Sequence, residues 1–214
     1  SRDFAIANNH PDWLLKQLQM DWPAHWQSIV EANNQQAPLW LRINGTQTTC
    51  AQYGSLLAES NVLFTVSELH EQALSIDQAV SPTRLPGWLE GMIAVQDLSA
   101  QLTALALDIK PGMTVLDMCA APGGKSAQLA EIGDIKLVLL DKEAARLKKA
   151  HDLFERLQLD SASVQTCAAD ASLAFPDELP QQYDAILLDA PCSATGIIRR
   201  QPDVKWHRQA KDID

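Results

Sequence analysis

The second half of the chain alternates between short apolar runs and longer amphipathic stretches. A short apolar run is typical of a buried strand, whereas apolar side chains three or four positions apart are typical of a helix. The expected strands cover residues 114–118, 137–141, 164–168 and 185–189, and the expected helices cover residues 95–107, 126–132 and 143–159. Apolar strands alternating with helices predict a parallel sheet covered on both faces, so an α/β domain is expected here.

The first half predicts a smaller α+β domain. Its spacing of apolar residues predicts helices near residues 13–22, 26–30 and 53–58, a strand at residues 39–43, and a mostly extended region after residue 58. Proline and glycine cluster between residues 81 and 87 and indicate a linker. The predicted domains are therefore residues 1–89 and residues 90–214.

Composition narrows the function. The net charge of −10 does not favour a protein held to nucleic acid by its overall charge, so RNA binding would need a local basic surface. The four cysteines lack the close spacing of a zinc site, and no metal is expected. No apolar run approaches the ~20 residues of a membrane helix, and residues 1–7 do not resemble a signal peptide. A cytoplasmic protein without a membrane segment is expected.

Each of the four expected strands has an aspartate within two residues of its end. These residues are Asp117, Asp141, Asp170 and Asp189. A single aspartate in such a place is often a helix cap or a turn residue. Four in succession indicate a ligand site, because the carboxyl ends of parallel strands meet at one edge of a sheet.

The loop after the first of these strands contains two adjacent glycines, Gly123 and Gly124. A P-loop would need a further glycine at position 119, which is Cys119, and a dinucleotide site would need the spacing G-x-G-x-x-G. S-adenosylmethionine has no phosphate. Its site needs a loop whose backbone can approach the ligand closely, as glycines allow, and an acid that binds the ribose, so it is the preferred ligand. Asp141 is expected to bind the ribose hydroxyls, and Asp170 is expected near the adenine amino group.

Several segments resemble the RNA 5-methylcytosine methyltransferases of the Sun family. Residues 117–125 (Asp-Met-Cys-Ala-Ala-Pro-Gly-Gly-Lys) resemble its cofactor motif, and residues 189–196 (Asp-Ala-Pro-Cys-Ser-Ala-Thr-Gly) resemble its second signature. Residues 96–101 look like a third motif, and residues 198–206 are similar to bacterial members that act on 16S ribosomal RNA. Residues 38–44 resemble the strand that opens the family's small RNA-binding subdomain.

The resemblance covers nearly the whole chain and implies a fold, a cofactor and a partner. The fold would be a Rossmann-like class I methyltransferase domain preceded by a small α+β RNA-binding subdomain. The cofactor would be S-adenosylmethionine, and the partner would be RNA, most closely 16S ribosomal RNA. The implied cofactor-binding residues are Cys119, Ala120, Ala121, Pro122, Gly123, Gly124, Lys125, Asp141, Asp170 and Asp189.

The resemblance also implies catalytic roles. Carbon 5 of cytosine becomes nucleophilic when a thiolate adds at carbon 6. Asp189 would contact the edge of the cytosine, and Cys192 would assist breakdown of the covalent adduct. The nucleophile of the family is a cysteine in a Thr-Cys-Ser motif on a later strand, and no Thr-Cys-Ser occurs here. A family sheet has seven strands and four are expected here, so a fragment that binds cofactor without methylating is predicted.

Several alternatives stay open. Cys192 could itself be the nucleophile, as a Pro-Cys cysteine is in DNA cytosine methyltransferases. The substrate could be a transfer RNA, or the chain could be an inactive module that binds S-adenosylmethionine or RNA. An oxidoreductase of the dinucleotide-binding class is a further alternative. A basic cluster is expected to contact RNA phosphates, and its members are Arg199, Arg200, Lys205 and Arg208.

Overall fold

The computed structural model describes residues 2–159, 163–173 and 175–213. The chain forms two compact units. The first, called the helical unit below, combines Ser1–Ala37 with Pro191–Asp214, and the second, the sheet unit, is Pro38–Ala190. The two ends of the chain therefore belong to the same unit.

The helical unit is built from short helices. They are α1 (Arg2–Asn8), α2 (Asp12–Asp21), α3 (Trp26–Asn33), η2 (Thr195–Ile197), α8 (Val204–His207) and η3 (Ala210–Asp212). The helix α2 starts directly after Pro11, because proline lacks the amide hydrogen that a helix start leaves unused. Leu14, Leu15 and Val30 are buried.

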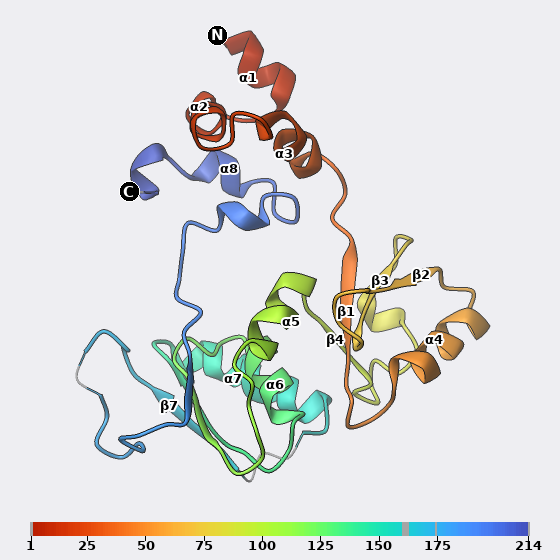
Figure 1. The fold of residues 1–214 in the computed structure, drawn as a ribbon, viewed down its shortest axis with the longest axis vertical. Helices are drawn as coiled ribbons and strands as arrows, with labels where there is room; N and C mark the ends of the chain where they lie inside the picture. The colour runs from red at the N-terminus through yellow and green to blue at the C-terminus, as the bar shows by residue number, and fades with distance from the viewer. Residues whose placement is uncertain (1, 160–162, 174, 214) are drawn as a thin grey trace. The chain divides into compact units, whose positions relative to one another are not determined.

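A small antiparallel sheet opens the sheet unit (Figure 1). Its strands are β1 (Leu39–Ile43), β2 (Phe64–Val66), β3 (Ala73–Ile76) and β4 (Ile93–Val95), in the order β2-β3-β1-β4. The helix α4 (Cys50–Glu59) begins with a capping box between Thr49 and Gln52. Tyr53 and Leu57 of this helix pack with the apolar side chains of the sheet in one buried core. The short helix η1 (Pro82–Arg84) lies in the predicted linker.

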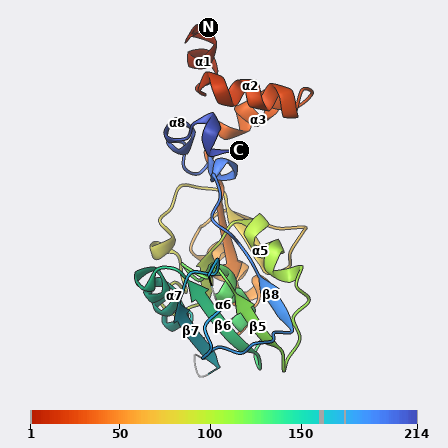
Figure 2. The ribbon, with the colours of Figure 1, turned by 90° about the vertical axis from the view of Figure 1, so that its left-hand side faces the viewer.

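The second sheet is parallel throughout. Its strands are β5 (Thr114–Asp117), β6 (Lys136–Asp141), β7 (Val164–Ala168) and β8 (Ala185–Leu187), in the order β7-β6-β5-β8. Figure 2 shows these strands side by side. The chain runs outward from β5 through β6 to β7 and then returns to the other side of β5, so the strand order reverses between β5 and β8. Ligands of open α/β sheets bind at such a reversal.

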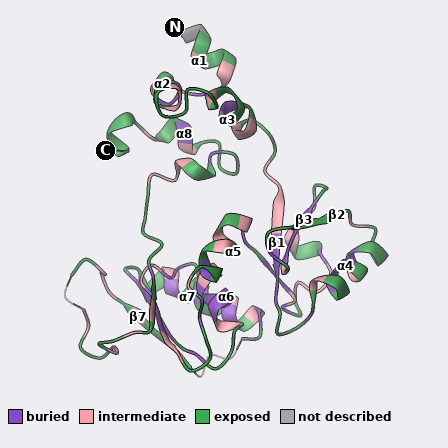
Figure 3. Ribbon diagram, in the orientation of Figure 1, coloured by how far each residue is buried: buried purple, intermediate pink, exposed green. Residues whose placement is uncertain are grey.

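Three helices share one face of the parallel sheet: α5 (Leu98–Leu105), α6 (Gly124–Ala130) and α7 (Ala144–Arg156). Val115, Leu137 and Leu139 point into the core that these helices cover. The alternate residues Leu116, Val138 and Leu140 pack on the opposite face with side chains from residues 169–183. Figure 3 colours much of α6 and of the neighbouring strands as buried.

Most of the predicted elements are confirmed. The strand Val164–Ala168 has the predicted bounds, and the other three parallel strands agree within two residues at each end. The helix predicted from residue 95 was wrong at its start. Val95 instead pairs with Leu41 as the last residue of β4, and the helix begins at Leu98. The predicted boundary between two domains at residue 89 stays a prediction. The strand β4 follows this boundary and is the last strand of the small sheet.

The described residues hold neither a membrane-spanning helix nor a cluster of metal ligands. In residues 2–159, 163–173 and 175–213, no helix has the length and apolar character needed to cross a membrane. Within the same residues, no three His, Cys, Asp or Glu side chains gather as metal ligands would.

Candidate cofactor-binding site

A pocket of about 160 Å³ lies where the parallel sheet reverses its strand order. Asp117 is the last residue of β5, and Asp189 follows β8 by two positions, so the two neighbouring strands each bring a carboxylate to it. The loop between β5 and α6 supplies most of the remaining wall. The lining residues are Gln96, Ala100, Asp117, Cys119, Ala120, Ala121, Pro122, Gly124, Lys125 and Asp189.

The loop is held against the end of β6 by backbone hydrogen bonds. The amide of Ala120 donates to the carbonyl of Leu140 over 3.0 Å, and the amide of Ala121 donates to Oδ2 of Asp141 over 3.2 Å. The peptide bond between Ala121 and Pro122 is cis. Alanines 120 and 121 are both buried, so the wall is made of backbone and small side chains rather than of bulky groups.

Gly123 and Gly124 have different structural roles. Gly123 caps α6 with a φ of +102°, and a Cβ there would lie 2.7 Å from the Cβ of Ala150 in α7. Only glycine combines this left-handed backbone with so close an approach of two helices. Gly124 lines the pocket, and a Cβ there would meet no protein atom within 4 Å. The first glycine therefore serves helix packing, and the second leaves space at the pocket.

Asp117 is buried, with one carboxylate oxygen unpartnered. Oδ2 accepts a hydrogen bond of 2.6 Å from Oγ of Ser126, while Oδ1 has no partner among the residues that the structure describes. Burial raises the pKa of the Asp117 carboxyl group. The hydrogen bond from Ser126, the nearby backbone amide of Cys119 and the charge of Lys125 oppose this shift only in part. A buried oxygen without a donor is costly, so a ligand donor at this position would be stabilised.

Asp189 forms an ion pair with Lys125. The distance from Nζ to Oδ2 is 2.5 Å, and the Lys125 side chain is mostly buried while Asp189 is exposed. Among the described residues that line the pocket, Lys125 is the only cationic one, against the two acids Asp117 and Asp189. The pocket therefore has a negative net charge, which suits a cationic ligand better than a diphosphate.

Asp141 and Asp170 do not line this pocket. Asp141 is buried, and its oxygens accept hydrogen bonds from the amides of Ala121 and Glu143 and pair with Arg146 at 3.4 Å. Asp170 pairs with Lys142 at 2.9 Å and accepts hydrogen bonds from Ser172. The hydrogen bonds from Ser172, followed by Lys142, lower the pKa of Asp170. Their predicted contacts with ribose and adenine stay predictions.

The cysteines differ in environment. Burial, followed by the charges of nearby aspartates, raises the pKa of the Cys119 thiol, so this pocket residue is a poor nucleophile. Cys192 belongs to the helical unit and is exposed, and its sulfur accepts a hydrogen bond from the amide of Ala194 over 3.4 Å. Burial also raises the pKa of Cys50. The catalytic role of Cys192 stays a prediction.

Two pocket residues, Gln96 and Ala100, were not among the predicted site residues. They fall in or beside the segment 96–101 that resembles the third family motif, which was the available signal. Oε1 of Gln96 accepts a hydrogen bond of 2.7 Å from Nε of Arg42, and Nε2 of Gln96 donates to Oε1 of Gln128 over 3.1 Å. These two hydrogen bonds connect the pocket wall to Arg42 of the small sheet and to Gln128 of α6.

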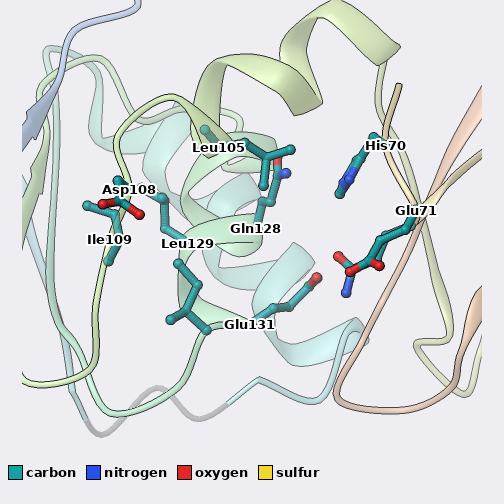
Figure 4. A pocket seen from close by; sticks show the side chains of 11 residues that line it. His70, Glu71, Leu105, Asp108, Ile109, Gln128, Leu129 and Glu131 are labelled. Atoms are coloured by element: carbon teal, nitrogen blue, oxygen red, sulfur yellow. The ribbon is translucent and has the colours of Figure 1, made fainter. Parts of the chain in front are cut away.

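The same polar cluster extends into a second hollow. Arg42 is fully buried and forms an ion pair with Glu131 at the end of α6. Glu131 and Gln128 line a separate pocket of about 330 Å³, with His70 and Glu71 on its other side (Figure 4). No residue of the loop 119–125 lines this second pocket, so it is distinct from the candidate cofactor site.

Comparison with known proteins identifies the family. The sequence model described as 16S rRNA methyltransferase RsmB/F matches residues 104–214, which is just over half of the chain. A second model, the ferredoxin-like domain of RsmF/B-like methyltransferases, matches residues 10–83. The chain belongs to the RsmB/F methyltransferase family. The predicted resemblance is therefore confirmed at the level of the family.

Relatives of this RsmB/F chain are similar along nearly all of its length. The ribosomal RNA small subunit methyltransferase B of Vibrio cholerae is 44% identical over 95% of the chain and 46% of its own length. The protein of that name from Pseudomonas putida is 42% identical over 99% of the chain and 48% of its own length. The chain thus spans about half the length of these relatives.

Solved structures support the fold of the RsmB/F chain. A methyltransferase homologue from Pyrococcus horikoshii matches with a TM-score of 0.79 at 25% identity, over 98% of this chain and 66% of its own. The NSun6 protein of the same organism, solved with SFG, matches with a TM-score of 0.80 at 17% identity, over 95% of this chain and 75% of its own. The α/β methyltransferase fold with a small preceding α+β domain is confirmed.

The charge and the small side chains of the pocket fit the methionine part of S-adenosylmethionine, the cofactor of the RsmB/F family. The unpartnered Oδ1 of Asp117 can accept a hydrogen bond from the cofactor's amino group. The negative net charge favours a sulfonium over the pyrophosphate of a dinucleotide. The open space at Gly124 removes a steric barrier to the methionine part.

Proposed function

We propose that this chain carries the cofactor-binding part of an enzyme that transfers a methyl group from S-adenosylmethionine to carbon 5 of a cytosine in ribosomal RNA, most closely 16S ribosomal RNA. The observation that carries the proposal is the pocket between β5 and β8, with an unpartnered buried carboxylate and a glycine-containing loop. The names of the two bacterial relatives support a ribosomal RNA substrate.

The cofactor roles of Asp117 and of the loop follow from their places in the pocket wall, and those of Asp141 and Asp170 follow from their places at the ends of β6 and β7. Asp117 would accept a hydrogen bond from the amino group of the cofactor, while the wall from Ala120 to Pro122 would lie against its methionine part. Asp141 would bind the ribose hydroxyls and Asp170 would lie near the adenine. When bound, S-adenosylmethionine supplies an electrophilic methyl group. The residues of this chain hold it in place and keep a negatively charged wall around its sulfonium.

The substrate roles centre on Asp189 and Cys192. The carboxylate of Asp189 can accept a hydrogen bond from the exocyclic amino group of a cytosine. Lys125, paired with the same carboxylate, fixes its direction. Cys192 would assist breakdown of the adduct formed by the Thr-Cys-Ser cysteine of the family. Since these 214 residues contain no Thr-Cys-Ser, we propose that they bind the cofactor but do not methylate on their own.

The proposal is tested by methylation of 16S ribosomal RNA followed by mass spectrometry of the nucleosides. The intact protein should form 5-methylcytosine, and these 214 residues alone should not. Methylation at another atom by the intact protein would overturn the carbon-5 assignment. RNA containing 5-fluorocytosine then separates the cysteine roles, because it traps the covalent adduct. The Cys192→Ala protein should still form the adduct if Cys192 only assists its breakdown.

A further inference from the structure

The helical unit buries a lysine that has no ion-pair partner among the described residues. Lys205 of α8 is 1% exposed, and its Nζ donates one hydrogen bond, of 3.3 Å, to Oδ1 of Asn34. Within residues 2–159, 163–173 and 175–213, no carboxylate lies within ion-pair distance of this ammonium group. Burial lowers the pKa of Lys205. A buried ammonium is costly unless it is paired, so this position favours an anion.

Lys205 lies in the wall of a pocket of about 550 Å³. Two more cations, Arg199 and Arg200, line the same pocket, together with side-chain amides from the end of α3 and the segment that follows it. None of the described lining residues is acidic. In a chain with a net charge of −10, this is a local concentration of positive charge. Amides add donors and acceptors that suit the oxygens of a phosphate.

The pocket is held in shape by hydrogen bonds that involve its own wall. Nδ2 of Asn9 donates to Oδ1 of Asn34 over 3.2 Å, and Nδ2 of Asn34 donates to the carbonyl of Asn8 over 3.1 Å. Arg199 donates to the carbonyl of Gln36 over 2.9 Å, which holds the C-terminal segment against the segment that follows α3. The amide oxygen that accepts from Lys205 is therefore fixed, and the ammonium group is held in place before any ligand arrives.

We infer that this pocket binds a phosphodiester group of the substrate RNA, with the ammonium group of Lys205 as its central contact. The inference rests on the proposed function and adds a binding subsite to it. It also divides the predicted basic cluster. Arg199, Arg200 and Lys205 line the pocket, whereas Arg208 does not and instead donates to the carbonyl of Ser193 over 2.8 Å.

The test compares Lys205→Met with Lys16→Met in the intact protein. Both variants lose one positive charge, but Lys16 is an exposed residue of α2 that does not line the pocket. Binding of a 16S ribosomal RNA fragment is measured by fluorescence anisotropy at several salt concentrations. K205M should bind on the order of 10-fold more weakly, and its plot of log K against log salt should be shallower by about 0.7–0.9. K16M should match the wild type, and unchanged binding and slope in K205M would overturn the inference.

A second arm needs no RNA and uses pyrophosphate as the probe. Pyrophosphate should raise the Tm of the wild type and of K16M but not that of K205M, because a ligand of the folded state stabilises it. No shift in the wild type would overturn the phosphate site. If K205M lowers the Tm while pyrophosphate has no effect on the wild type, then Lys205 only stabilises the helical unit through contacts such as that with Asn34, and the inference is again wrong.

These two arms separate this inference from the proposed function. If the wild type methylates RNA and K205M binds RNA as well as the wild type does, the phosphate site is wrong and the proposed function still holds. If the wild type neither binds RNA nor methylates it, the proposed function is wrong. The pyrophosphate experiment would still decide whether the pocket binds phosphate.

Discussion

At the scale of single residues, Asp117 shows how one buried group can be costly for folding and useful for binding. Its carboxylate is 1% exposed, and only one of its oxygens has a donor among the described residues. Asp117 also lines the candidate cofactor pocket, where a ligand with an amino group could satisfy the unpartnered oxygen. The free energy lost by burying this carboxylate would then be recovered on binding rather than on folding.

Substitution of Asp117 by Asn should weaken cofactor binding. The change removes the charge while keeping the shape and the hydrogen-bonding capacity toward Ser126. A hydrogen bond to a charged group contributes about 1.5–3 kcal/mol, so the Kd for adenosylhomocysteine should rise roughly 10- to 100-fold. Isothermal titration calorimetry measures this. Lys110→Met, which changes an exposed residue outside the pocket, is the control, and an unaltered Kd in D117N would remove Asp117 from the site.

The same variant has a predicted pH dependence without ligand. Because burial raises the pKa of Asp117 in the folded state, folding favours the protonated form, and the cost of the charge is fully present only above the raised pKa. D117N should therefore be more stable than the wild type at neutral pH. This advantage should shrink as the pH falls from the raised pKa toward the ordinary value of a carboxyl group. Thermal unfolding between pH 4 and pH 8 measures it, and a constant difference would contradict the assignment.

At the scale of elements, the neighbouring glycines separate helix packing from ligand binding. A Cβ at Gly123 would meet α7 and would also force a left-handed backbone, whereas a Cβ at Gly124 would meet nothing. Gly123→Ala should lower the free energy of unfolding by about 2 kcal/mol or more. Gly124→Ala should leave it nearly unchanged and weaken adenosylhomocysteine binding. Chemical denaturation and calorimetry on both variants check this, and equal loss of stability in the two would contradict the division of roles.

The elements that the sequence predicted well are those with a clear local pattern of residues. The strand β6 was predicted because its side chains from Leu137 to Asp141 are all buried. The strand Val164–Ala168 was predicted with its observed bounds although none of its residues is buried. Val95 was assigned to a helix because its partner in the sheet, Leu41, lies far away in the sequence. The pairing of β2 with β3 likewise depends on contacts that no local pattern reveals.

The candidate site was predictable to a similar extent. The loop from Cys119 to Lys125 was found from its sequence, and all of it except Gly123 lines the pocket. Gln96 was missed as a site residue because its place in the wall depends on a buried cluster with Arg42 and Gln128. That cluster joins a strand of one sheet to a helix on the other, and such a long-range contact leaves no periodic signal in the sequence.

At the scale of the whole molecule, the chain passes between its two units twice, after Ala37 and after Ala190. Both sheets lie in the sheet unit, where the ion pair between Arg42 and Glu131 and the hydrogen bonds of Gln96 connect them. Removing one partner of such a buried pair would leave an uncompensated charge, which typically costs about 3–5 kcal/mol. The two sheets are therefore expected to unfold together rather than as separate domains.

This organisation predicts that residues 38–190 suffice for cofactor binding. All of the residues that line the candidate cofactor pocket lie between these limits, as do the side chains that support it. A protein of residues 38–190 should show one cooperative thermal transition and should bind adenosylhomocysteine with a Kd within about threefold of that of the 214-residue chain, a difference under 1 kcal/mol. The Asp117→Asn form of the same segment is the matched control and should bind more weakly. If the segment folds cooperatively but does not bind, then groups from the helical unit contribute to the cofactor site, and the boundary of that site would have to include residues beyond Ala190.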